Sequence, residues 1–288
     1  MSENFRPVEK SRGNIFNSIN RKKSSSCIVM GILNVTPDSF YNGSRRFNLD
    51  DAVKRGLEIW DSGALWLDIG GESTRPGAEP VDVEEELRRV IPVIEELKKI
   101  RPDGLISIDT RRPIVAKKAI NSGADMLNDV SGLTNPDMVE VVVETGCAVC
   151  IMHMQGLPEN MQENPNYGDC IGEVSQFLFN QAEILLSKGH SKELIVLDPG
   201  IGFGKKLHHN IELLKEIEIL TKSEYSIMLG ISRKSMIGQI TGKEDPEDRL
   251  AGTLASSAFA FYNEIDIIRV HDVEQNIDLM KVLNELEN

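Results

Sequence analysis

The sequence lacks the features that mark membrane proteins and nucleic-acid-binding proteins. Its 32 lysines and arginines are outnumbered by 45 aspartates and glutamates, and the formal net charge of −13 argues against a nucleic-acid polyanion as a partner. No apolar run approaches the roughly 20 residues that cross a membrane. We therefore expect neither a membrane nor a nucleic acid as a partner.

Cysteine is scarce, with one residue each at positions 27, 147, 150 and 170. Cys147 and Cys150 have the spacing of a CxxC motif, but their apolar run is typical of a strand, on which residues three apart point to opposite faces. We therefore expect no shared metal or redox pair, and predict reduced core thiols in a cytoplasmic protein. The chain also has no HExxH, zinc-spaced Cys/His cluster, P-loop or GxSxG motif.

The charge is distributed unevenly along the chain. Residues 1–26 hold six lysines and arginines against Glu3 and Glu9, and no apolar core of a secretory signal. An organellar transit peptide is an alternative for this serine-rich start, but the two glutamates argue against it. We predict a polar basic N-terminal tail over 1–26, disordered or loosely docked, and a single domain over 27–288.

Short apolar runs rich in isoleucine, valine and leucine recur from residue 27 onward. Their continuous apolar character, without in-and-out alternation, is typical of parallel strands that are covered on both faces. Eight such runs are present, at 27–34, 65–70, 105–110, 126–131, 147–153, 194–200, 226–232 and 266–272.

Helical stretches separate these runs, and several begin with acidic residues or end near a glycine. We expect helices over 49–63, 83–100, 111–123, 135–146, 170–189, 210–222, 245–263 and 273–288. Eight strand–helix units predict a single-domain α/β fold, the (β/α)8 TIM barrel, which typically needs about 250 residues. An open doubly wound sheet is the alternative, but it normally has a glycine-rich turn after its first strand, which this chain lacks.

Polar residues stand at or just beyond the end of every predicted strand. In a (β/α)8 barrel these carboxyl ends meet at one mouth, where active sites are built. Helix capping or turn chemistry explains a single Asp or Asn at such a place, but not all eight ends. The residues are Asn34, Asp68, Asp109, Asn128 with Asp129, His153, Asp198, Ser232, and Arg269 with His271.

The residue types at this mouth indicate the kind of ligand. Asp109, Asn128 and Asp198 offer acceptors and an amide, which suit a planar heterocycle with adjacent N–H groups. Lys234 follows the seventh strand. These residues predict a polar ring system held deep in the barrel.

Three further side chains would form a cationic rim at the same mouth. Arg269 and His271 are two residues apart on the eighth strand, so they point the same way. With Arg75, which follows the second strand, they suit a phosphate or a diphosphate. Many barrels of this kind bind phosphate after strands seven and eight, which agrees with this position.

Eight short segments carry sequence motifs in a fixed order. They are GILNVTPDSF (31–40), DIGGESTRPG (68–77), SIDTRRP (107–113), NDVSG (128–132), MHMQG (152–156), LDPGIGFGK (197–205), GISRKS (230–235) and RVHDV (269–273). Together they resemble the dihydropteroate synthase family of pterin-binding enzymes, over about residues 27–273. The first two segments and LDPGIGFGK are highly specific.

The resemblance implies a transferase of folate biosynthesis. Such enzymes join 6-hydroxymethyl-7,8-dihydropterin diphosphate to p-aminobenzoate and release pyrophosphate and 7,8-dihydropteroate. It also implies the cofactor Mg²⁺, small-molecule substrates as partners, and a homodimer. The apolar segment LAGTLASSAFAFY either faces the barrel or forms a dimer seam.

Site residues follow from the same resemblance, motif by motif. The pterin ring would be held by Asp109, Asn128, Met152, Asp198, Phe203 and Lys234. The diphosphate would be bound by Asn34, Thr74, Arg75, Arg269 and His271, with Asn34 as the Mg²⁺ ligand. The aminobenzoate would lie against Phe40, Thr74, Arg75, Pro76, Phe203, Lys234 and Ser235. The catalytic set would be Asp109, Asp198, Lys234, Arg269 and His271.

The first loop departs from the family's pattern. The family usually has SFSDGG where this chain has SFYNGS, so Asn42 replaces an acidic residue and Ser44 a glycine. The family's acid is thought to steady a cationic intermediate, and Asp38 could partly take over that role. The LDPGIGFGK segment carries no insertion of the kind that marks sulfonamide-insensitive relatives, so we expect ordinary sulfonamide sensitivity.

Two other functions remain open from the sequence. One is a related barrel that transfers a methyl group from methyltetrahydrofolate to a corrinoid protein, which needs no diphosphate site. The other is a non-catalytic barrel that only binds a pterin or a partner. Lys234, the ESTRPG loop and the Arg269/His271 pair favour the synthase over the methyltransferase.

Overall fold

The computed structural model describes residue 15 and residues 17–20, 26–36, 49–73, 81–158 and 160–287. Its strands form a closed, all-parallel barrel in which each strand pairs with its neighbours in chain order and β8 pairs with β1. The strands are β1 (Ile28–Asn34), β2 (Trp66–Gly70), β3 (Leu105–Asp109), β4 (Met126–Asp129), β5 (Ala148–Met152), β6 (Ile195–Asp198), β7 (Ser226–Leu229) and β8 (Ile267–Val270). The predicted (β/α)8 barrel and its eight strand positions are confirmed.

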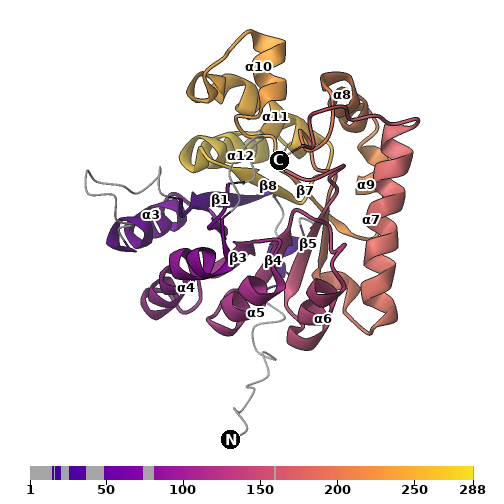
Figure 1. The fold of residues 1–288 in the computed structure, drawn as a ribbon. Coiled ribbons are helices and arrows are strands. Elements are labelled where there is room, and N and C mark those ends of the chain that lie inside the picture. Colours follow the sequence, from indigo (N-terminus) through magenta and orange to yellow (C-terminus); the bar gives the residue numbers. More distant parts are fainter. Residues whose placement is uncertain are drawn as a thin grey trace, which may run out of the picture.

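Helices surround the strands as an outer ring (Figure 1). The α-helices are α3 (Leu49–Asp61), α4 (Val83–Ile100), α5 (Pro113–Asn121), α6 (Pro136–Thr145), α7 (Cys170–Ser187), α8 (Leu207–Lys215), α9 (Glu218–Thr221), α10 (Ser235–Thr241), α11 (Leu250–Tyr262) and α12 (Val273–Glu287). Two short 3₁₀ helices, η2 (Lys192–Leu194) and η3 (Pro246–Arg249), precede β6 and α11. No described helix is long and apolar enough to span a membrane.

Local sequence signals explain where these helices begin and end. The side chain of Asp82 accepts a hydrogen bond from the Glu85 amide at the start of α4, and acidic residues in the first turn with lysines in the last suit the helix dipole. Helix α6 begins at Asn135–Pro136 and ends at Gly146, which adopts the left-handed conformation at φ 62°.

Two helix predictions were wrong in extent. The predicted helix over 245–263 consists of η3 followed by α11, and the predicted helix over 210–222 consists of α8 and α9, with α8 beginning at Leu207. Around η3, the Arg249 guanidinium donates to the carbonyl oxygens of Arg233, Lys243 and Glu244. These bonds hold the chain in a tight turn before α11.

The interior of the barrel changes from apolar to polar toward the carboxyl ends of the strands. Its lower part is filled by side chains such as Ile28, Met30, Trp66 and Met126. Two residues further along the strands, the inward positions carry polar and charged side chains. These are Asp68, Asp109, Asn128, Asp198 and Arg269.

Residues from the predicted N-terminal tail complete the apolar end of the barrel. Ile15 and Ile19 are buried in the same cluster as Ile28 and Trp66, and the Trp66 indole N–H donates to the carbonyl oxygen of Ser18 at 2.9 Å. Part of the 1–26 segment therefore packs against the domain. The domain boundary at residue 27 stays a prediction.

The cysteines follow the strand geometry that their spacing predicted. Cys147 packs in the outer core between strands and helices, whereas Cys150 lies in the barrel interior. All four cysteines are buried, and none forms a disulfide.

Candidate active site

A buried ion-pair cluster lies at the carboxyl end of the barrel. The Arg269 guanidinium, from β8, donates through Nε to Asp68 Oδ2 at 2.5 Å and through Nη2 to Asp109 Oδ2 at 2.8 Å. Asp68 is fully buried and Asp109 nearly so. Because isolated charges in such a place are strongly unfavourable, each side chain here depends on its partner.

Asn128 joins this cluster from β4. Its amide Nδ2 donates to Asp68 Oδ2 at 3.1 Å. Three buried polar atoms around it, Asn128 Oδ1, Asp68 Oδ1 and Ser107 Oγ, have no hydrogen-bond partner in the part of the chain that the structure describes. Buried polar groups are almost always paired, so these atoms mark a place where a polar ligand or water completes the interior.

The charges of the cluster shift the pKa values of its members. Burial raises the pKa of Asp109 to about 7; Arg269 opposes this shift, and the carboxylate of Asp68 adds to it. Burial lowers the pKa of Arg269, but the carboxylates of Asp68 and Asp109 outweigh it and raise that pKa above its usual range. Arg269 is therefore a permanent cation, while Asp109 can take up a proton near neutral pH.

A second group of site residues lies on β6 and beyond β7. Asp198 ends β6, and its Oδ1 accepts from the Gly200 amide at 2.8 Å. Lys234 donates from Nζ to the Ile201 carbonyl oxygen, and this Nζ lies 4.5 Å from the centre of the Phe203 ring. Burial lowers the pKa of Lys234 to about 8, against the opposing charge of Asp198. The lysine is thus a donor whose charge is favoured by the nearby charge of Asp198.

His271, beyond the end of β8, contacts Ser232 from the loop after β7. Ser232 Oγ lies 3.1 Å from His271 Nδ1 and accepts from the His271 backbone amide at 3.2 Å. Since the hydroxyl already accepts from the amide, its hydrogen can donate to Nδ1. This arrangement favours the tautomer with the hydrogen on Nε2.

An ion-pair network holds the base of the loop after β2. The Glu72 carboxylate accepts from the guanidinium groups of Arg111 and Arg112, which follow β3, and from the Val81 amide at 3.1 Å. Arg112 also donates to Glu86 and to the Val81 carbonyl oxygen. Although burial opposes it, the two arginines keep the pKa of Glu72 below its usual range.

The structure places most of the predicted site residues around one mouth. Met152 ends β5 in register with Asp198, and Asn34 ends β1 in register with Gly70, which pairs with Asp109. Ser235 is the exposed first residue of α10. Phe40, Thr74, Arg75 and Pro76 lie outside the described residues, as do Asp38, Asn42 and Ser44.

Several residues of the site had no predicted role. Asp68 was expected only as a polar strand end, and Ser107 was not expected at all. Asp129, also a strand end, has a structural role, because its carboxylate accepts from the Ser131 amide and hydroxyl and from the Leu133 amide. The alternation of residues along β2 and β3 could have placed Asp68 and Ser107 in the interior, but could not have identified the partners of Asp68.

The described residues contain no group of three or more His, Cys, Asp or Glu side chains that could hold a metal ion. Asn34 is half-buried at the mouth, and its amide oxygen is a hard ligand of the kind that Mg²⁺ accepts. Mg²⁺ usually binds through few protein ligands together with substrate phosphates. The residue therefore fits a metal that arrives with a diphosphate.

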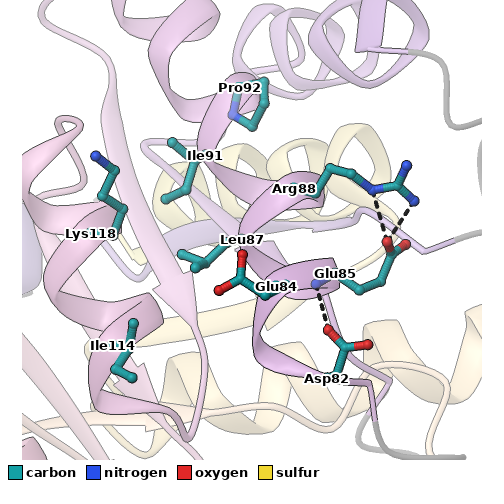
Figure 2. A pocket seen from close by; sticks show the side chains of 9 residues that line it. All are labelled: Asp82, Glu84, Glu85, Leu87, Arg88, Ile91, Pro92, Ile114 and Lys118. Atoms are coloured by element: carbon teal, nitrogen blue, oxygen red, sulfur yellow. Dashed lines mark hydrogen bonds and ion pairs between the residues drawn. The ribbon is translucent and has the colours of Figure 1, made fainter.

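A groove lies on the outer wall of the barrel. It runs between α4 and α5, with Leu87, Ile91 and Ile114 on its walls and Arg88 and Lys118 among its charged residues (Figure 2). It includes none of the candidate site residues.

The parallel barrel and the charged carboxyl-end mouth define a (β/α)8-barrel enzyme that binds a polar, anionic small molecule. Residues 30–271 match the family model described as pterin binding enzyme, and the chain belongs to this family. Dihydropteroate synthase of Escherichia coli (strain K12) is 46% identical over 255 residues, which cover 88% of this chain and 90% of that protein.

Two solved structures show the same relationship. The Yersinia pestis dihydropteroate synthase, in a sulfonamide drug complex, is 42% identical, with a TM-score of 0.85. The match covers 91% of this chain and 95% of that chain. The Xanthomonas albilineans dihydropteroate synthase with 4-aminobenzoic acid is 41% identical, with a TM-score of 0.85. The match covers 91% of this chain and 93% of that chain. The family resemblance in the sequence motifs is confirmed.

Proposed function

We propose that this chain condenses 6-hydroxymethyl-7,8-dihydropterin diphosphate with p-aminobenzoate, giving 7,8-dihydropteroate and pyrophosphate. One observation carries the proposal. Arg269, a partly buried cation, is held between Asp68 and Asp109 directly beside acceptors for a heterocycle. A ring with N–H groups and an anionic substituent uses both features at once.

The pterin ring binds at the polar layer of the barrel interior. The carboxylates of Asp109 and Asp198 and the unpaired Asn128 Oδ1 accept from ring N–H and amino groups. Lys234 Nζ donates to a ring acceptor, and Met152 and Phe203 pack against the ring faces. Because the two carboxylates and the Asn128 amide are buried, they bind the ring without reorganising at the moment of reaction.

The diphosphate leaves toward the cations at the rim. Arg269 and Arg75 donate to its oxygens, and His271 donates through Nε2. Asn34 would hold a Mg²⁺, which would supply neutralisation of the charge on the leaving oxygens. The C–O bond between the pterin methylene and the diphosphate breaks, and both electrons go to pyrophosphate.

The methylene cation that remains is flanked by carboxylates, and the aromatic amine of p-aminobenzoate attacks it. The new C–N bond takes the nitrogen lone pair, and the amine loses one proton to solvent. No covalent enzyme intermediate is needed, so positioning and electrostatics supply the rate. Phe40, Thr74, Arg75, Pro76 and Ser235 border the aminobenzoate, together with Phe203 and Lys234.

The test is pyrophosphate release from the two substrates, coupled to product detection by chromatography. Release that needs both substrates and stops when Mg²⁺ is chelated supports the proposal. Pterin binding without release would leave only a binding barrel, and methyl transfer from methyltetrahydrofolate would indicate the related methyltransferase. Sulfonamides are expected to compete with p-aminobenzoate and raise its KM.

Two properties of the whole chain belong to the same proposal. We propose a homodimer, supported by the uncharged face of α11, and a cytoplasmic location, supported by four buried cysteines that form no disulfide.

A further inference from the structure

Lys205 is a buried lysine that the reaction described above does not use. It lies in the loop between β6 and α8, and only 3% of its surface is exposed. No carboxylate in the described part of the chain forms an ion pair with it. A lysine is rarely buried without a carboxylate partner, so the burial of Lys205 needs an explanation.

Four acceptors surround the Lys205 ammonium. Nζ lies 3.0 Å from His153 Nδ1 and 3.2 Å from the His153 carbonyl oxygen. The carbonyl oxygens of Gly200 and Phe203 are each 3.0 Å away. Because an ammonium carries three hydrogens and no acceptor, the histidine Nδ1 accepts and one hydrogen is shared. Lys205 thus ties the end of β5 to the turn that follows β6.

The same turn is held from the other side by the catalytic lysine. Lys234 Nζ donates to the Ile201 carbonyl oxygen and lies over the Phe203 ring. Residues 200–203 therefore lie between two ammonium groups. Lys205 binds the carbonyls at both ends of the turn, and Lys234 binds the carbonyl within it.

Backbone geometry shows how closely this turn is fitted to His153. Gly200 has φ 68°, and a Cβ there would lie 1.9 Å from the His153 carbonyl oxygen. The carbonyl that Lys205 binds is thus the one against which the turn packs. Burial lowers the pKa of Lys205 to about 7. Burial and the adjacent ammonium lower the pKa of His153 to about 3, so the imidazole stays a neutral acceptor.

We propose that Lys205 is a positioning residue, which fixes the turn 200–203 so that the Phe203 ring and the Ile201 carbonyl hold Lys234 in place against aminobenzoate and pterin. This inference rests on the proposed function, since its effect is on the binding of those substrates. Lys205 itself touches no substrate.

The test compares Lys205→Met with Lys98→Met in the full chain. Lys98 is a matched lysine, because it is also largely buried and donates to Asp125 and to the Gly104 carbonyl oxygen, each at 2.7 Å, but next to the amino ends of β3 and β4. We expect Lys205→Met to raise the KM for p-aminobenzoate at least tenfold, with a smaller change in kcat. Lys98→Met should lower the thermal midpoint with KM unchanged.

A double variant separates positioning from general destabilisation. In the Phe203→Ala background, Lys205→Met is expected to raise that KM less than threefold further, because the ring it positions is gone. A tenfold effect in both backgrounds, or a KM within twofold of the parent in Lys205→Met, overturns the proposal. If Lys205→Met does not fold, His153→Leu removes one acceptor and should raise the KM about threefold, and an unchanged KM overturns the proposal.

Failure of the proposed function would be distinguishable from failure of this inference. If the unsubstituted chain releases no pyrophosphate, the function is wrong. If it turns over normally and the variants match it, only the role of Lys205 is wrong.

Discussion

Asp68 supports two site residues from beneath the place where substrate binds. One of its oxygens accepts from both the Arg269 guanidinium and the Asn128 amide, which come from strands on either side of β2. In the proposed function, this single carboxylate therefore orients one side chain for the diphosphate and another for the pterin. Losing its charge disturbs both, although neither substrate needs to touch it.

We expect Asp68→Asn to lower kcat/KM for the pterin diphosphate by about 10- to 100-fold, the size of losing one or two oriented hydrogen bonds in a site. The free energy of unfolding should fall by about 1–3 kcal/mol. This is less than for a fully broken buried pair, because Arg269 keeps its ion pair with Asp109. Steady-state kinetics and urea unfolding measure the two effects. Asp278→Asn, at an exposed ion pair, is the control; equal behaviour of the two variants would contradict the role of Asp68.

Asp109 makes stability depend on pH in a defined window. Its pKa is about 7 in the fold, chiefly because of burial, and near 3.8 when unfolded. Between these values the native state holds a proton that the unfolded state has released, so the free energy of unfolding falls as pH rises. From pH 5 to pH 7.5, we expect the wild type to lose about 2 kcal/mol relative to Asp109→Asn. Urea unfolding at both pH values measures the difference, and parallel curves would show that Asp109 ionises normally.

At the scale of single residues, the sequence identifies the polar residues of the mouth but not the side chains with which they pair. Asp109, Asn128, Asp198 and Arg269 could be assigned to one mouth because strand ends converge in a barrel. The two carboxylates that Arg269 bridges could not be predicted, since they depend on the register by which β8, β1, β2 and β3 close the barrel. Lys205 was given no role of its own because a lysine in a loop is ordinarily exposed.

At the scale of elements, the turn after β6 is the most constrained segment of the site. Gly200, Gly202 and Gly204 all have positive φ, which glycine adopts without strain. The strand before this turn could be predicted because its apolar run is continuous, and the structure confirms it. The fold of the turn could not be predicted, because it depends on contacts with His153 and Gln155 that sequence patterns do not show.

Gly200→Ala should be far more damaging than alanine at a glycine in open space. Besides the left-handed backbone, which costs about 1–2 kcal/mol, the new Cβ would meet the His153 carbonyl oxygen at 1.9 Å. We expect a total loss of about 3–5 kcal/mol in stability, as for an overpacked core site with strain, and loss of activity because Asp198 and Lys234 shift. Gly189→Ala, at φ 86° with nothing within 4 Å of the added Cβ, is the matched control. It should lower the free energy of unfolding only by what the left-handed backbone costs an alanine. Equal unfolding midpoints for the two variants would show that the turn has room to relax.

At the scale of the whole molecule, the barrel separates stability from chemistry. Its amino end is closed by apolar side chains, including Ile15 and Ile19, and its carboxyl end carries the charges. The outer wall is more varied. Helix α11 has no charged residue from Leu250 to Tyr262, although Ala251, Ala255 and Tyr262 are exposed. An outer helix of a barrel ordinarily has a charged, polar face, and α11 has no charged residue there.

A second copy of the chain is the partner we propose for that face, and a charge placed there tests it. Ala255→Glu should convert a dimer into a monomer in sedimentation equilibrium, because burying an unpaired carboxylate in an apolar interface costs several kcal/mol. Ile114→Glu, at a 64% exposed position on α5, is the matched control and should leave the dimer intact. A wild-type chain that sediments as a monomer at micromolar concentration would exclude the dimer. A dimer that survives Ala255→Glu would place the interface on another wall of the barrel, where the exposed Ile184 of α7 offers the next apolar position.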